Sequence, residues 1–209
     1  MFLNKHNLAI AALASKDQTR YALHGLHITP TETAATDGHC LGRVTLPDFP
    51  RGDFPVVGVE ESDKPFAPCI IPKDAADRLA KQLPKKASIP ILENALVDIE
   101  RSQGDTFRAV TTDRDTTQPL EVSKVEGEFP TLDNVMPTGE PVLTVGFNAL
   151  LLAQVLKVAG SITDSQNRVV KLEFFDQKYK GKQVGPVKIT CQNVHTGQTG
   201  TFLVMTCQV

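Results

Sequence analysis

Three short stretches of this 209-residue sequence hold the side chains best suited to chemistry. Asp37, His39 and Cys40 stand close together and include the residue types of a thiol nucleophile and its base. If they lie on a strand, however, His39 and Cys40 point to opposite faces and do not readily meet. His24 and His27 are three residues apart, which also places them on opposite faces of a strand and gives poor metal-ligand geometry.

The third stretch offers carboxylates. Asp113 and Asp115 share a strand face, but a divalent cation would need a third carboxylate, and none is obvious nearby. The sequence has no G-x-G-x-x-G, no phosphate-binding P-loop and no G-x-S-x-G. We therefore predict no catalytic activity, no metal and no cofactor. A small-ligand or metal-binding protein is the weaker alternative.

The cysteines and the apolar runs bear on the compartment. Cys40, Cys69, Cys191 and Cys207 match no zinc spacing, and we predict free, buried thiols in a reducing cytosol. The apolar run Leu8–Ala14 follows Lys5 like a minimal signal peptide, but an Ala-rich helix explains it equally well. No run approaches the length of a membrane span. We expect a cytoplasmic protein.

The charge balance excludes a polybasic protein. Lys and Arg number 22 against 24 Asp and Glu, so the net charge is -2. Binding to nucleic acid would need a local basic patch. The absence of Trp and the presence of only two Tyr disfavour a base-stacking surface for single strands.

Three segments have the pattern of helices. The first is 5–15, with Asn4 or Asn7 as a possible cap. The second follows Pro72, has apolar residues at helical spacing and stops at Pro84. The third follows the possible N-cap Asn148 and is expected to stop at Gly160.

Alternating apolar and polar residues predict strands between and after these helices. Turn signals separate neighbouring strands at Gly104-Asp105 and at His195-Thr196-Gly197. The predicted strand regions are 21–29, 33–46, 92–101, 106–112, 120–125, 170–174, 187–192 and 203–209.

The order of these segments suggests an internal repeat. Each helix is followed by two or three strands, and Thr33–Asp37 is echoed by Ala109–Asp113 and more weakly by Ile189–Asn193. Polar, Pro-rich connections over about 47–68 and 126–141 join the three copies. We predict an α+β protein with antiparallel sheets and helices on one face of them.

Two blocks and their order resemble a known family. The stretch Asp17–Leu26, with R-Y-A-L-H-G-L, leads into A-T-D-G-H-C-L at Ala35–Leu41, and F-P-T-L-D-N-V-M-P stands at Phe129–Pro137. These are similar to the R-Y-x-L-x-G, A-T-D-G-H-R-L and F-P-D-Y-x-x-V-x-P segments in the middle domain of the bacterial DNA sliding clamp, the beta subunit of DNA polymerase III. Val145–Asn148 with the Leu-rich helix, and Phe202–Met205, resemble the second half of that clamp's last domain.

The resemblance covers most of the chain and implies one and a half clamp domains. Residues 1–137 would form a clamp-like domain of two half units, about 1–48 and 65–137, and 138–209 would form another half domain. The first strand of the middle domain looks short or missing. Cys40 replaces the usual Arg, Asn134 stands where a basic residue is common, and the tail Thr206–Val209 replaces Pro-Met-Arg-Leu.

A clamp of this family encircles duplex DNA and tethers a polymerase without covalent chemistry, which implies cationic helices that contact phosphates weakly. Residues 73–86 contain five basic and two acidic residues, although a solvated helix face with ordinary capping charges has the same composition. The expected DNA-facing residues are Lys5, Arg20, Lys73, Arg78, Lys81, Lys85 and Lys157.

The resemblance also implies a pocket, between the middle and last domains, for hydrophobic peptide motifs of a polymerase or other clamp-binding proteins. The same residues could instead be ordinary strand residues of a core. The expected pocket residues are Leu23, Thr36, Gly38, His39, Leu41, Pro130, Val135, Leu203, Val204, Met205 and Val209.

We further expect a homo-oligomer, because half a domain leaves a sheet edge and an apolar face unpaired. If a ring holds a dozen helix units, three per chain imply a tetramer. The alternative is an adaptor or decoy that binds clamp-interacting proteins without DNA.

Overall fold

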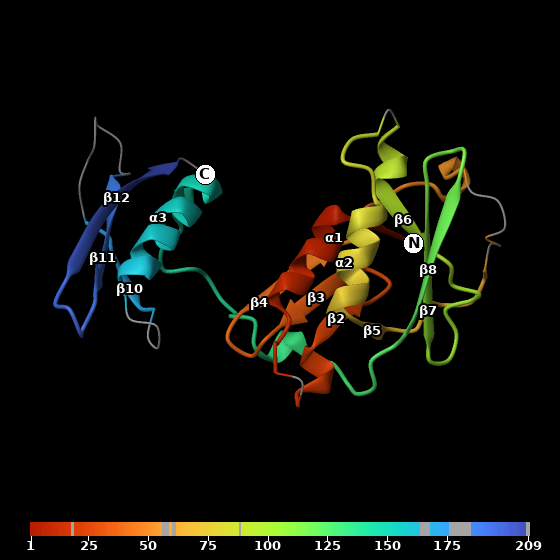
Figure 1. Ribbon diagram of the computed structural model, residues 1–209, viewed down its shortest axis with the longest axis horizontal. Coiled ribbons are helices and arrows are strands. Elements are labelled where there is room, and N and C mark those ends of the chain that lie inside the picture. The colour runs from red at the N-terminus through yellow and green to blue at the C-terminus, as the bar shows by residue number, and fades with distance from the viewer. Residues whose placement is uncertain are drawn as a thin grey trace. The chain divides into compact units, whose positions relative to one another are not determined.

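The computed structural model describes residues 1–17, 19–55, 59, 62–87, 89–163, 168–175 and 185–207. The chain divides into two compact units, Met1–Met136 and Pro137–Val209, and each is described by itself (Figure 1). Within the described residues, every helix falls short of the length and apolar character that crossing a bilayer requires.

The first unit, Met1–Met136, contains two half units of the same design: a short strand, a helix and three antiparallel strands. The elements of the first half are β1 (Phe2–Asn4), α1 (Lys5–Ala9), η1 (Ile10–Leu13), η2 (Tyr21–Leu23), β2 (Gly25–Ile28), β3 (Glu32–Thr36) and β4 (Leu41–Thr45). Those that follow are η3 (Arg51–Asp53), β5 (Cys69–Pro72), α2 (Lys73–Gln82), η4 (Pro90–Glu93), β6 (Asn94–Val97), β7 (Thr106–Thr112), β8 (Thr117–Ser123) and η5 (Leu132–Asn134).

The two half units exchange their first strands. One sheet has the order β1-β6-β7-β8 and the other β4-β3-β2-β5, so each strand that precedes a helix joins the sheet of the other half. Leu3 pairs with Ala95, and Leu26 pairs with Ile71. This exchange ties the halves together through main-chain hydrogen bonds.

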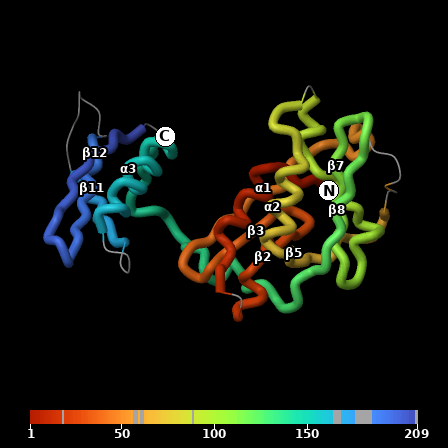
Figure 2. Tube along the Cα trace, in the orientation of Figure 1, coloured from red at the N-terminus to blue at the C-terminus, as the bar shows by residue number. Residues whose placement is uncertain are grey.

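A common core lies between the helices and the sheets. Helices α1 and α2 pack side by side (Figure 2). Leu8 and Leu79 from the helices meet Leu3, Ile71 and Phe107 from the sheets in this core. Each of these side chains is at most 1% exposed. The apolar positions at helical spacing are therefore the ones that the unit buries.

The second unit, Pro137–Val209, holds one half unit. Its sheet has the order β10-β11-β12-β9, and Val187, Ile189 and Val204 are buried on one face of it. The elements are β9 (Gly146–Phe147), α3 (Ala149–Ile162), β10 (Val170–Glu173), β11 (Pro186–Gln192) and β12 (Thr199–Cys207).

The helix starts follow the predicted caps. Asn4 accepts from the N–H groups of His6 and Asn7, and Asn148 caps α3 in the same way. The predicted stop at Gly160 is wrong, because α3 continues to Ile162. The first helix has α geometry only to Ala9 and continues as the 3-10 turn η1.

The three echoed sequences form the same turn. The Oδ1 atom of Asp37 accepts from the N–H groups of His39 and Cys40, and Asp113 and Asn193 accept from the amides two and three residues later in the same way. These are Asx turns, in which a side-chain oxygen replaces a backbone acceptor. The repeat is thus structural, and Asp113 serves a turn.

Other differences from the sequence predictions are local. The short strands β1, β5 and β9 pair at sheet edges but carry too few residues for a period-two pattern. The cysteines are free, but only Cys69 and Cys191 are buried; Cys40 and Cys207 are exposed, which corrects the expectation of four buried thiols.

Candidate functional site

The residues that the sequence predicted for a partner pocket in the first unit line one cavity of about 290 Å³. One wall is the turn between β3 and β4, and the other wall is the chain segment after β8. The predicted residues that line it are Leu23, Thr36, Gly38, His39, Leu41, Pro130 and Val135. Cys40, Thr131 and Leu132 also line it and were not predicted.

The Asx turn shapes one wall of the pocket. The two backbone N–H groups, of Cys40 and His39, lie 2.8 Å from Asp37 Oδ1 and lower the pKa of this carboxyl to about 2. Gly38 has a φ of +91°, in the left-handed region that favours glycine. Residues 37–40 therefore belong to a turn, which corrects the strand placement of His39 and Cys40 on which the argument against a catalytic pair relied.

Two side-chain contacts attach the opposite wall, 129–135, to the sheet. The ring of Phe129 stacks on His27 with centroids 4.5 Å apart and an interplanar angle of 11°. Arg43 on β4 binds Glu32 on β3 through both carboxylate oxygens, and its Nη1 lies 3.6 Å from Asp133 Oδ1. These contacts hold Pro130 and Val135 against the turn.

The pocket presents apolar side chains to solvent. Val135 is 68% exposed, and Leu23, Leu41 and Leu132 are half-buried. Desolvation and a hydrogen bond to Asp37 raise the pKa of the Cys40 thiol, so this thiol stays protonated and is a poor nucleophile. The surface suits the apolar side chains of a short peptide better than bond-making chemistry.

A cation stands at the pocket rim. Arg20 Nη1 lies 3.5 Å from the carbonyl oxygen of Asp37, and Arg20 Nε lies 3.8 Å from Asp17. Arg20 was predicted to face DNA, but it lies beside the pocket turn. Arg20 thus places a positive charge at the rim, whereas Cys40, which replaces the Arg usual in sliding clamps, is uncharged.

The predicted C-terminal pocket residues belong to the second unit. Leu203 is 66% exposed and Met205 is 48% exposed, because odd-numbered residues of β12 point away from α3. Val204 points the other way and is buried, so it cannot contact a peptide in an open pocket. Val209 lies outside the described residues.

Helix α2 and the residues directly after it present a basic surface. Arg78, Lys81 and Lys85 are exposed, and they form no ion pair with any residue that the structure describes. Lys73 pairs with Asp77 one turn later, and Lys5 Nζ donates to the carbonyl oxygen of Pro84. Their charges are thus partly used within the fold.

Helix α3 is different in character. Lys157 is exposed and is the single basic residue of the helix, whereas Leu150 is 82% exposed and Leu151 is 53% exposed. The exposed surface of α3 is therefore more apolar than that of α2.

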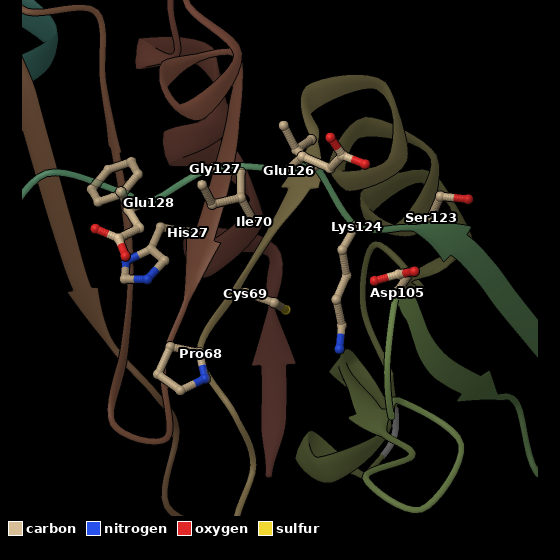
Figure 3. A pocket seen from close by; sticks show the side chains of 12 residues that line it. His27, Pro68, Cys69, Ile70, Asp105, Ser123, Lys124, Glu126, Gly127 and Glu128 are labelled. Carbon is tan, nitrogen blue, oxygen red and sulfur yellow. The ribbon is translucent and has the colours of Figure 1, made fainter.

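A larger cavity of about 650 Å³, which no sequence pattern predicted, lies between β5 and the chain that leaves β8 (Figure 3). Burial raises the pKa of the Cys69 thiol to about 11, so it is protonated at neutral pH. Lys124 Nζ donates to the carbonyl oxygens of Ser102 and Gly104. These groups serve the fold.

The histidine and carboxylate candidates are also used locally. His24 Nδ1 lies 2.8 Å from the carbonyl oxygen of Ser15, and Asp113 accepts from the amides of Asp115 and Thr116. Within the described ranges, His, Cys, Asp and Glu form no group of three that could hold a metal ion.

Comparison with known proteins finds a likeness in structure only. The sequence matches no profile of a known family and no characterised protein. The C. crescentus beta sliding clamp has a TM-score of 0.66 and 18% identity, over 99% of this chain and 50% of that chain. The beta subunit of DNA polymerase III from Pseudomonas aeruginosa has a TM-score of 0.67 and 19% identity, over 99% and 50%.

A DnaN sliding clamp from Bartonella birtlesii, in complex with griselimycin, has a TM-score of 0.66 and 20% identity, over 100% of this chain and 51% of that one. This chain thus spans about half the length of the clamps that it matches. The predicted α+β, clamp-like fold is confirmed, as is the resemblance to bacterial sliding clamps.

Proposed function

We propose that this protein is a non-enzymatic processivity factor: a homo-oligomeric ring around duplex DNA that holds a polymerase or another partner by a hydrophobic peptide. The observation that carries the proposal is the sliding-clamp fold over the full described chain. The pocket in Met1–Met136 and the basic surface of α2 are the two features that such a role uses.

DNA would meet the exposed cations of α2 and of the residues directly after it. Arg78, Lys81 and Lys85 are exposed and pair with no acidic residue in the described part of the chain, so they can contact phosphates, and such contacts carry no base preference. Weak contacts suit a sliding protein, because each phosphate contact can break while others form. Lys157 would add one charge from α3.

The partner would insert apolar side chains between Leu41 and Val135, with Arg20 at the rim for an acidic group. On the second unit, Leu203 and Met205 of β12 are exposed apolar side chains that a partner peptide could also contact. A peptide backbone can approach closely at Gly38.

The test replaces Arg78, Lys81 and Lys85 together with Glu and measures retention on nicked circular DNA against linear DNA. Encirclement predicts that the unaltered protein stays on the circle, leaves the linear form, and loses retention in the triple variant. A matched triple replaces Lys64, Arg101 and Arg114, which lie outside the helices, and should keep retention. Equal retention of the two triples would contradict the proposal.

An adaptor without DNA is the second candidate, and one observation favours it. The described pocket lies wholly within Met1–Met136, so a partner can bind there without a ring. In that case both triple variants bind the partner peptide as the unaltered protein does, and no form is retained on circular DNA.

A further inference from the structure

The second unit contains one half unit, whereas the first unit contains two. Its single half unit repeats the strand–helix–three-strand order found twice in Met1–Met136. In the first unit, the strand before each helix lies against the first strand after the other helix: β1 against β6, and β5 against β2. A complete domain therefore needs two half units that exchange strands.

Strand β5 shows what surrounds such an exchanged strand. One edge of β5 pairs with β2, and Ile70 bridges to Val125, just beyond β8 of its own half, on the other side. Strand β9 has the second kind of contact, because Phe147 pairs with Thr206 near the end of β12. Among the described residues, the position that β2 occupies beside β5 is open beside β9.

The outer edge of β10 is the matching position. Strand β6 holds β1 at this edge, and β2 holds β5 there, whereas the described sheet of the second unit ends at β10. As far as its described residues show, the half unit has an open edge for a strand like β2 and an open edge for a strand like β5. Its own β10 and β9 are strands of these two kinds.

The exposure of corresponding positions in the three helices supports the same conclusion. The third residue after the N-cap is Asn7 in α1, Ala75 in α2 and Leu151 in α3, with exposures of 0%, 1% and 53%. The fourth residue is fully buried in α1 and α2, as Leu8 and Ala76, but the corresponding Leu152 is only half-buried. Positions that a complete domain buries are apolar and uncovered in α3.

We propose that a second copy of this chain covers them: two Pro137–Val209 units join about a twofold axis and form one composite clamp-like domain. Strand β9 of each copy lies against β10 of the other, and the two α3 helices pack as α1 and α2 do. A twofold contact is self-complementary, so one surface supplies both halves. Exchanged main-chain hydrogen bonds and buried leucines stabilise it.

The first unit also fixes the register. Leu26 lies opposite Ile71, which directly precedes the N-cap Pro72, and Phe147 directly precedes the N-cap Asn148. The pairs Ile28–Thr33 and His27–Ala34, continued by one residue, set Leu26 in line with Ala35, which pairs with Gly42. Val170 begins the corresponding row, through Cys191 to Gly200. Phe147 should therefore lie opposite Val170 of the partner subunit.

The composite domain rests on the proposed function as one contact of the ring, yet the dimer does not require DNA. A dimer that is not retained on circular DNA would overturn the ring and leave the composite domain standing. An oligomer that forms through other surfaces would do the reverse.

The first experiment is light scattering of the full chain at micromolar concentration. The expected mass is twice the 22.7 kDa of one chain, or a multiple of that dimer, and Leu151→Asp should halve it. Leu150→Asp is the matched control, because its counterparts His6 and Asp74 are exposed in the complete domain. A monomeric mass overturns the proposal, because the open edges would then be filled by another protein's half unit. A mass that Leu151→Asp leaves unchanged overturns it as well.

The second experiment is independent of helix substitutions. In a Cys40→Ser, Cys207→Ser background, a chain with Phe147→Cys is mixed with a chain with Val170→Cys and oxidised. Directly opposed residues have Cα atoms about 4.5–5.5 Å apart, within the range of a disulfide. A covalent dimer is expected with Val170→Cys and not with Lys171→Cys, whose side chain points to the other face. Equal yields, or no dimer in either mixture, contradict the register.

Discussion

Single residues decide the shape of the pocket, and Asp37 is the most direct test of this. Asp37→Ala removes the acceptor for the amides of His39 and Cys40, so the turn that carries Gly38 loosens. We expect peptide affinity to fall about tenfold, as for a lost charge-assisted hydrogen bond. Asp37→Asn keeps the acceptor, as Asn193 does in the second unit, and should bind the peptide nearly normally in calorimetry. Equal loss in both variants would assign the effect to charge.

The same carboxyl predicts a pH dependence. Its pKa is lowered to about 2, so the ionised form holds the turn throughout the range above its usual pKa of 3.8. The stabilisation is lost as the pH falls through about 2. In an NMR titration, the side-chain carboxyl carbon signal of Asp37 should stay near its ionised position from pH 7 to 4 and move to the protonated position only near pH 2. A midpoint near 4 would contradict the hydrogen-bonded turn.

At the scale of elements, the exchange of β5 onto β2 depends on close approach at Gly25. A Cβ atom at this position would lie 2.3 Å from the carbonyl oxygen of Ile71, which is backbone and cannot move alone. Gly25→Ala should lower the free energy of unfolding by about 1–3 kcal/mol, the usual cost of overpacking. Gly52→Ala is the control, since no atom of the described residues, apart from the glycine and its two chain neighbours, lies within 4 Å of its added Cβ. Denaturant unfolding measures the free energy of unfolding of both variants. Equal effects would contradict the close approach of β5 to β2 at Gly25.

The sequence alone predicted the long elements well. Strand β7 occupies Thr106–Thr112 as expected from its alternation, and α2 lies between Pro72 and Pro84 as its prolines indicate. The strand exchange was beyond reach, because β1 and β5 are three and four residues long and owe their pairing to distant partners. The burial of Val204 was missed because both faces of β12 carry apolar residues.

For the site, the A-T-D-G-H-C-L block placed the pocket turn because its glycine and aspartate have local conformational roles. The position of Arg20 beside that turn depends on the path of residues 17–23 and had no local signal. The larger cavity near Cys69 had none either, since it forms where β5 meets the chain after β8.

At the scale of the whole molecule, the two units should unfold differently. Met1–Met136 contains both of its half units, so its thermal midpoint should not depend on protein concentration. If Pro137–Val209 is completed by a second copy, mass action stabilises it as concentration rises. Calorimetry over a hundredfold range of concentration should move one transition upward and leave the other fixed. Two fixed transitions would contradict the composite domain.

The open edges of β9 and β10 make the second unit dependent on how many copies a cell produces. With few copies, chains would remain solitary and expose the leucines of α3, a substrate for chaperones and proteases. With many copies, pairing would protect them. The abundance of the paired protein would then rise more steeply than in proportion to gene dosage, because solitary chains would be degraded.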